Sequence, residues 1–241
     1  MNIFRTIAMF IYLFGYMIVH YGVLRRGERA LAAGDTETVE QIVRKHIPHW
    51  SRKILKITGV QLTVTGLENI PKDTACVFVG NHRSYYDIPL LLASLDAPHG
   101  ILAKEELEKI PLLNRWMKLL GCVFVQRDDV RASVRALNDA TAIVESGKSF
   151  VIFPEGTREK EGRLMQPKSG LFVIAAQAGV DVVPARVIYD TPDGKMKLFC
   201  KVTVVYGEPI PAAQFAMESR RDTKKLRENK QLLLEKWTEL G

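Results

Sequence analysis

Cysteine is scarce in this chain of 241 residues, which contains only three. Cys76, Cys122 and Cys200 each lie in a short apolar run, where small buried thiols are common. The sequence therefore indicates neither a disulfide framework nor a zinc site. Internal repeats and low-complexity linkers are also lacking, and the length suits one sizeable α/β domain with an appendage.

Signatures of nucleic-acid binding are lacking as well. The formal net charge of +7 favours an anionic partner, which can be nucleic acid, an acidic membrane surface or a phosphorylated small molecule. No helix-turn-helix, zinc-finger or RNA-binding pattern accompanies the basic residues. We therefore expect no nucleic-acid partner and favour membrane lipids.

Charged residues are missing from residues 6–24, if His20 is counted as neutral. A run of about 19 uncharged residues just reaches the length of a membrane-spanning helix. Arg25, Arg26 and Arg29 follow it in place of a small-residue cleavage site, so we expect a retained helix and not a signal peptide. The apolar run predicts attachment to the cell membrane, and this positive flank places everything downstream of the run on the cytoplasmic side.

A second amphipathic helix is predicted after the break at residues 33–35. Its apolar residues recur at helical spacing. They are Val39, Val43, Ile47, Trp50, Ile54 and Ile57. We expect Pro48 to kink or divide this helix. The apolar stripe suits packing on the core of the following domain as well as it suits the membrane interface, and residues 1–58 are predicted to be membrane-anchoring helices.

Residues 59–241 are predicted to form an α/β domain, because short β-rich runs alternate with helical segments. We expect a mixed, mostly parallel sheet flanked by helices, with the N-terminal helical pair associated with the membrane. The predicted helices cover residues 87–94, 105–120, 130–145 and 169–178, with a charged helix after Pro211. Ligands of such sheets gather at the carboxyl ends of the strands.

The first candidate site follows a buried-looking strand. His82 stands at the strand end, and Asp87 stands near the start of the next helix. A carboxylate bonded to one ring nitrogen fixes the tautomer and leaves the other nitrogen free to accept a proton, so the pair suits a general base. A strand-end histidine followed by an aspartate helix cap is the structural alternative.

The second candidate site is residues 153–158, with the sequence FPEGTR directly after an apolar strand. Arg158 suits two-pronged recognition of a phosphate, and Gly156 allows close approach of the backbone. Glu155 suits a hydrogen bond to a glycerol-type hydroxyl, and Thr157 adds a hydroxyl to the same turn. A purely structural turn would not need this combination.

Together these motifs make the chain resemble the 1-acylglycerol-3-phosphate acyltransferases and related glycerolipid acyltransferases. That family pairs an NHxxxxD block, here residues 81–87, with an FPEGTR block in the same order. The resemblance implies that Arg127, at the end of the strand predicted over residues 123–127, contacts phosphate. It also places Lys104 and Lys168 near the substrate phosphate, although isolated lysines are as often solvated surface charges.

The implied activity moves a fatty acyl group from acyl-CoA or acyl carrier protein to the sn-2 hydroxyl of 1-acyl-glycerol-3-phosphate, giving phosphatidate for phospholipid biosynthesis. No GxSxG elbow is present, so we expect direct transfer with His82 as base and Asp87 as its partner, without metal or cofactor.

Three alternatives stay open. One is a sibling acyltransferase acting on glycerol-3-phosphate, another lysophospholipid or a lyso-aminolipid. Another is a catalytically silent protein that binds anionic lipids through its basic helices. The third is a hydrolase in which His82 activates water.

Overall fold

The computed structural model describes the chain except for residues 1–2, 96–98, 127–128, 160–162, 192–196 and 217–221. All seven β-rich runs form strands of one sheet, in the order β1-β7-β6-β2-β5-β3-β4. Their bounds are β1 Gln61–Thr65, β2 Cys76–Gly80, β3 Gly100–Lys104, β4 Val123–Val125, β5 Phe150–Ile152, β6 Asp181–Tyr189 and β7 Lys201–Tyr206. Every pairing is parallel except that of β6 with β7, which confirms the predicted mixed, mostly parallel sheet.

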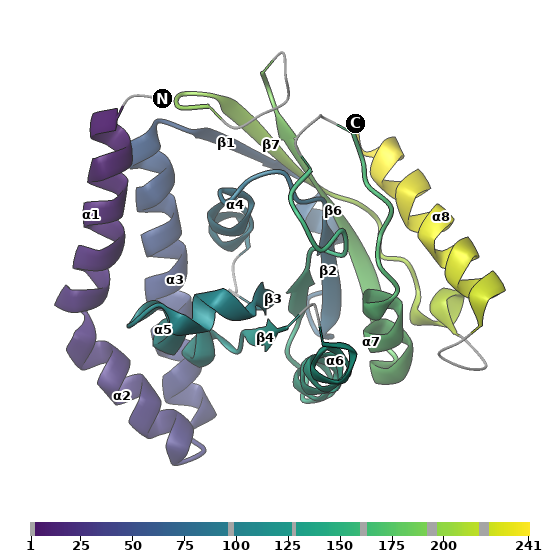
Figure 1. Cartoon of the computed structure of the whole chain (residues 1–241), viewed down its shortest axis with the longest axis horizontal. Helices are drawn as coiled ribbons and strands as arrows, with labels where there is room; N and C mark the ends of the chain where they lie inside the picture. The colour runs from purple at the N-terminus through teal and green to yellow at the C-terminus, as the bar shows by residue number, and fades with distance from the viewer. Residues whose placement is uncertain (1–2, 96–98, 127–128, 160–162, 192–196, 217–221) are drawn as a thin grey trace.

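Helices cover both faces of the sheet (Figure 1). On one face lie α1 Ile3–Val19, α2 Tyr21–Ala32, α3 Thr36–Thr58, α4 Asp87–Ser94 and α5 Leu113–Leu120; on the other lie α6 Val130–Glu145, α7 Gly170–Ala178 and α8 Thr223–Glu239. Short 3₁₀ helices complete the described elements: η1 Leu67–Asn69, η2 Glu105–Lys109 and η3 Ala212–Phe215.

Alternation along β2 explains this three-layer arrangement. Cys76 and Phe78 belong to the hydrophobic core under α3 and α4, whereas Val77 and Val79 belong to the core under α6, α7 and α8. Successive side chains of a strand point to opposite faces, so a continuous apolar run is buried on both sides. All five residues of β2 are buried, as its central place in the sheet requires.

Two predicted helices differ from expectation. The helix expected over residues 105–120 is two elements, η2 and α5, because Pro111 lacks a backbone N–H and Leu112 has a left-handed φ of 64°. By contrast, α3 is not divided at Pro48, which lies buried inside the helix. The interior position costs one hydrogen bond there, and tertiary packing on both sides holds the helix together.

The apolar stripe of α3 packs on the protein core, which decides between the two readings of that stripe. Val39, Val43, Ile47 and Ile54 are all buried. The helix begins with the Asp35 carboxylate accepting a hydrogen bond from the Thr38 N–H, and it ends at Thr58, just before β1. The function of residues 1–58 as a membrane-anchoring unit stays a prediction.

The uncharged run at the start of the chain is split between α1 and α2, which meet at an angle of 58°. Among the described residues no single helix has the length and apolar character to cross a membrane, and only this bent pair together meets that test. The outer side of α1 is nevertheless apolar and exposed. Its exposed residues include Ile3, Phe4, Ile7, Phe10, Ile11, Phe14, Ile18 and Val19.

Candidate active site

The two motifs meet because β2 and β5 are parallel neighbours, so their carboxyl ends lie at the same edge of the sheet. His82 follows β2 by two residues, and the FPEGTR turn begins directly after β5. The ring of His82 stacks on Phe153, with 4.4 Å between the ring centroids. The fold therefore brings together the two blocks that the sequence singled out.

His82 is bonded to Asp87 as the sequence predicted. The Nδ1 atom lies 2.7 Å from the Asp87 Oδ2 atom, and the His82 side chain keeps 14 % of its surface exposed, while that of Asp87 is wholly buried. The Nε2 atom has no hydrogen-bond partner among the residues that the structure describes. A bond at Nδ1 holds the proton there, so the opposite nitrogen is left as an acceptor.

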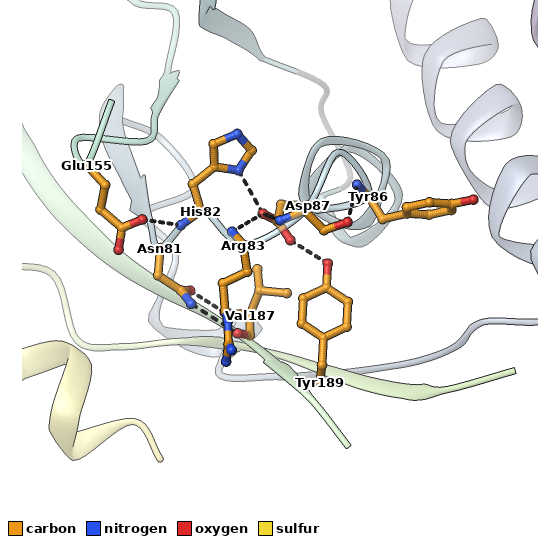
Figure 2. A network of polar contacts seen from close by, with 9 residues as sticks. Asn81, His82, Arg83, Tyr86, Asp87, Glu155, Val187 and Tyr189 are labelled. Carbon is orange, nitrogen blue, oxygen red and sulfur yellow. Dashed lines mark hydrogen bonds and ion pairs between the residues drawn. The ribbon is translucent and has the colours of Figure 1, made fainter. Parts of the chain in front are cut away.

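Asp87 is held by four donors, which Figure 2 displays in part. Its Oδ2 atom also accepts hydrogen bonds from the backbone N–H groups of Arg83 and Ser84, both at 2.7 Å. The hydroxyl of Tyr189, the last residue of β6, donates to Oδ1. Tyr189 was missed by the sequence reasoning, because no local pattern connects it to the NHxxxxD block.

Asn81 fixes this loop to the sheet. Its Oδ1 atom accepts from the Val187 N–H at 2.7 Å, and its Nδ2 atom donates to the Val187 carbonyl at 3.2 Å (Figure 2). Asn81 is 3 % exposed, so these bonds satisfy a buried amide. Asn81, the first residue of the NHxxxxD block, thus attaches the loop to β6, the strand that also carries Tyr189.

Glu155 faces the protein rather than the open side of the site. Its Oε2 atom accepts from the His82 N–H at 2.9 Å, and its Oε1 atom lies 3.4 Å from the Met165 N–H donor. The side chain is 2 % exposed, and burial raises its pKa to about 7. This placement favours a positioning role for Glu155 over the expected contact with a substrate hydroxyl.

The last three residues of the FPEGTR turn lie nearer the surface. Gly156 has a φ of 70°, and a side chain there would meet the Lys168 Nζ atom at 2.8 Å, so the turn requires glycine. The Arg158 guanidinium stacks on the exposed ring of Tyr85 at 3.7 Å from the centroid. Thr157 is exposed beside them.

Of the remaining predicted phosphate contacts, Lys168 lies at the FPEGTR turn, whereas Lys104 has another partner. Lys104, at the end of β3, forms an ion pair with Glu106, and both side chains are more than half exposed. Arg127 lies outside the described residues. Lys168 reaches the turn itself, as its N–H donates to the Pro154 carbonyl at 2.8 Å.

Two of the three cysteines are unsuited to nucleophilic attack. Burial raises the pKa of the Cys76 thiol to about 11 and that of Cys122 to about 12, so neither forms a thiolate near neutral pH. Within the described ranges, no group of three or more histidine, cysteine and acidic side chains has an arrangement that would hold a metal ion.

A family model described as Acyltransferase matches residues 61–188, which include both motifs. The chain belongs to the acyltransferase family. The structure of the 1-acyl-sn-glycerophosphate (LPA) acyltransferase from Thermotoga maritima is 30 % identical and superposes with a TM-score of 0.76, over 99 % of this chain and 95 % of that one. The resemblance seen in the motifs is thereby confirmed.

Two curated relatives give the range of the family. A chloroplastic 1-acyl-sn-glycerol-3-phosphate acyltransferase from Brassica napus is 44 % identical over 122 residues, 50 % of this chain and 35 % of that protein. A lyso-ornithine lipid O-acyltransferase from Rhizobium meliloti is 29 % identical over 168 residues, 69 % of this chain and 54 % of that protein. The chain thus spans between about a third and about half of the lengths of these relatives.

Proposed function

We propose that this acyltransferase moves a fatty acyl group from a thioester donor to the sn-2 hydroxyl of 1-acyl-glycerol-3-phosphate, giving phosphatidate. The observation that carries the proposal is the His82–Asp87 pair, whose free ring nitrogen lies at the sheet edge shared with the FPEGTR turn. The names of the Brassica and Thermotoga relatives support the same acceptor.

In the proposed reaction the acceptor hydroxyl gives its proton to the Nε2 atom of His82 as the oxygen attacks the thioester carbonyl carbon. Asp87 stabilises the imidazolium that forms. The tetrahedral intermediate then collapses with cleavage of the carbon–sulfur bond, and the thiolate takes the proton back from His82. An ester and a free thiol result, and His82 returns to its neutral form.

Direct transfer, without an acyl-enzyme, agrees with the burial of two cysteines and with the hydrogen bonding of the serine in the NHxxxxD loop. Cys76 and Cys122 are buried thiols of raised pKa, and Ser84 accepts a hydrogen bond from the Tyr86 N–H at 3.2 Å. Within the described residues, none of these groups is hydrogen-bonded to the Nε2 atom of His82, the atom that would have to remove its proton. The acyl group therefore passes in one displacement from sulfur to the acceptor oxygen.

The acceptor phosphate is proposed to bind the cations of the FPEGTR turn. Arg158 is held by the ring of Tyr85, and the Lys168 ammonium lies against Gly156. Neither cation forms an ion pair within the described part of the chain. A doubly charged headgroup would give both a partner, and its binding would orient the hydroxyl toward His82.

Membrane attachment is proposed to occur through the exposed apolar side of α1, with the catalytic domain on the cytoplasmic side. The Tyr86 hydroxyl donates to the Met9 Sδ atom at 3.1 Å, so α1 lies directly beside the NHxxxxD loop. A lipid surface at α1 would therefore present lysolipid close to His82. Arg25 and Arg26 follow on exposed positions of α2, where anionic headgroups would meet them.

A second acceptor class is favoured by the Rhizobium relative, whose name specifies a lyso-ornithine lipid. Such an acceptor keeps a free hydroxyl and an acyl chain but has an amino-acid headgroup without phosphate. Arg158 and Lys168 would then bind a carboxylate in place of a phosphate. Competition between lysophosphatidate and lyso-ornithine lipid for one labelled donor separates the two acceptors.

The proposal is tested with purified protein on vesicles that contain lysophosphatidate, supplied in parallel with acyl-CoA and with acyl carrier protein thioester. We expect phosphatidate from the unmodified protein and a loss of about 10³-fold or more in His82→Ala. His49→Ala is the matched control, because His49 is exposed on α3 and lies outside the site.

Near-normal turnover by His82→Ala would refute the proposed base. Release of free fatty acid without any acceptor would support a hydrolase instead. Absence of transfer to every acceptor, with retained binding to anionic vesicles, would support a silent lipid-binding protein.

A further inference from the structure

The two oxygens of the Asp87 carboxylate are bonded very differently. Oδ2 accepts three hydrogen bonds, from the His82 ring and from the N–H groups of Arg83 and Ser84. Within the described residues, Oδ1 accepts one, from the hydroxyl of Tyr189. Because Asp87 is wholly buried, this hydroxyl is the substitute for water at that oxygen (Figure 2).

The sheet places Tyr189 with little freedom. β2 ends opposite Ala185 of β6, and β6 continues beside the loop that carries His82 and Asp87. Asn81 binds both backbone groups of Val187, which points to the same face as Tyr189 two residues later. Tyr189 is 4 % exposed and is paired with Val202 of β7, so its ring cannot swing out of the site.

We propose that Tyr189 is a positioning residue for acyl transfer, which sets the basicity of His82 through its hydrogen bond to Asp87. The proposal deepens the proposed function and rests on it, because it takes His82 to be the base. Tyr189 touches neither reacting group. Its hydroxyl donates to the Asp87 carboxylate, which in turn is hydrogen-bonded to the ring of His82.

The sign follows from the charge on Asp87. A donor at Oδ1 stabilises the carboxylate and so reduces its need for the positive charge of a protonated His82. Without that donor, the buried pair binds a proton more strongly, and His82 is neutral only at higher pH. Burial and the charge of Asp87 keep the pKa of Tyr189 well above its ordinary value, so the phenol stays a donor throughout.

Other titratable groups face this cluster and stay in place when Tyr189 is changed. Arg83 lies in the same loop as His82, Glu155 faces Asp87 from the FPEGTR turn, and Cys200 faces Tyr189 from the segment before β7. Burial raises the pKa of Glu155 to about 7, within the pH range of the test. Its contribution is common to wild type and variant, so the comparison cancels it.

The first test is the pH dependence of kcat/KM for wild type and Tyr189→Phe on vesicles. On the acid side of this profile, which we call the acid limb, kcat/KM falls as His82 becomes protonated. Losing one of four hydrogen bonds to a buried carboxylate should shift the acid limb to higher pH by about one unit. The variant is then about tenfold slower at pH values below the limb, and the deficit shrinks as the pH rises. A purely structural tyrosine would give a deficit that is independent of pH.

Tyr206→Phe is the matched control. Tyr206 is a second buried tyrosine, 1 % exposed, on the neighbouring strand β7, and its hydroxyl lies 2.6 Å from the Ser94 Oγ atom, away from His82. Its loss should lower the melting temperature and leave the acid limb unmoved. Equal acid limbs in Tyr189→Phe and Tyr206→Phe would overturn the inference.

A second readout needs no substrate. In protein labelled with ¹⁵N-histidine, with the His82 signals assigned from His82→Ala, the titration midpoint of the ring should rise by about one unit in Tyr189→Phe. 3-Fluorotyrosine at position 189, a more acidic and stronger donor, should lower it. A midpoint unmoved by either change, in a wild type that transfers acyl groups, refutes the role of Tyr189 and leaves the proposed function standing. Shifted midpoints in a protein without transfer refute the function alone.

Discussion

Replacement of Glu155 by glutamine should make the protein less sensitive to pH between about 4.5 and 7. Glu155 is almost fully buried, and desolvation raises its pKa from 4.5 to about 7. Glutamine has nearly the same shape and carries no charge at any pH. Its amide oxygen can still accept the hydrogen bond from the His82 N–H that Glu155 accepts at 2.9 Å.

The magnitude follows from linkage between protonation and folding. Below pH 4.5, Glu155 is protonated in both states; as the pH rises, the unfolded chain loses this proton first, and the folded state loses it only near pH 7. Stability therefore falls with rising pH across this window. A separation of roughly 2.5 pH units, at about 1.36 kcal/mol each, corresponds to about 3 kcal/mol.

Thermal unfolding in detergent, followed by tryptophan fluorescence at pH 5 and pH 8, measures the effect. At this chain length about 3 kcal/mol corresponds to roughly 6–12 °C. We therefore expect the melting temperature of Glu155→Gln minus that of wild type to be larger at pH 8 than at pH 5, by an amount of that order. Glu155→Ala is the control: it also lacks the ionisable group and should show the same change with pH, but it leaves the His82 N–H unpaired and should be less stable than Glu155→Gln by about 1–3 kcal/mol at both pH values.

A difference in melting temperature between Glu155→Gln and wild type that does not change with pH would refute this reasoning. It would mean that Glu155 is solvated or exchanges its proton as freely as in the unfolded chain. Turnover separates the roles further. A positioning Glu155 allows the glutamine variant to stay within about tenfold of wild type, whereas a carboxylate that binds the substrate hydroxyl would not.

Two further predictions concern the acceptor and the membrane. Tyr85→Ala should raise KM for lysophosphatidate several-fold with little change in kcat. Tyr85→Phe should leave KM unchanged, because either aromatic ring can hold Arg158 at the observed 3.7 Å. Steady-state kinetics at fixed donor concentration checks this, and equal KM values in both variants would contradict it. Phe10→Glu, at a half-exposed position of α1, should reduce sedimentation with vesicles several-fold. Leu67→Glu, at a similarly exposed position of η1, should leave sedimentation unchanged. Unchanged sedimentation of Phe10→Glu would count against attachment through α1.

Much of the catalytic domain follows from local patterns. The seven strands and most of the helices are each predicted by a short run of residues, and the parallel sheet follows from their alternation. The same logic brings His82 and the FPEGTR turn together, because strand ends of a parallel sheet share an edge. The hydrogen bond from the His82 ring to Asp87 joins residues only five positions apart in the sequence.

The N-terminal helices are harder to predict, because an apolar stripe has the same spacing whether protein or lipid covers it. The stripe of α3 is buried by protein, and the exposed apolar surface belongs to α1. The break between α1 and α2 falls at His20 and is not marked by proline. At this break the His20 ring and its N–H both lie 3.0 Å from the Tyr16 carbonyl oxygen.

Tyr189 could not be found from its neighbours, because it is one more apolar-facing residue of a strand and lies about a hundred residues from Asp87. Only the register of β6 against β2 brings its hydroxyl to the carboxylate. The direction of Glu155 is equally hidden. A carboxylate in a turn can face substrate or backbone, and the choice depends on which N–H groups the rest of the fold presents.

The structure gives a physical reason for the two motifs to occur together. Both backbone groups of His82 are held by the second motif and the residue after it: its N–H donates to Glu155, and its carbonyl accepts from the Glu159 N–H at 2.8 Å. Arg158, between them, stacks on Tyr85 of the first motif. A histidine at the end of a strand has two free backbone groups and would otherwise be free to shift. The FPEGTR turn removes this freedom, so a change in it should disturb the orientation of His82 as well as the binding of phosphate.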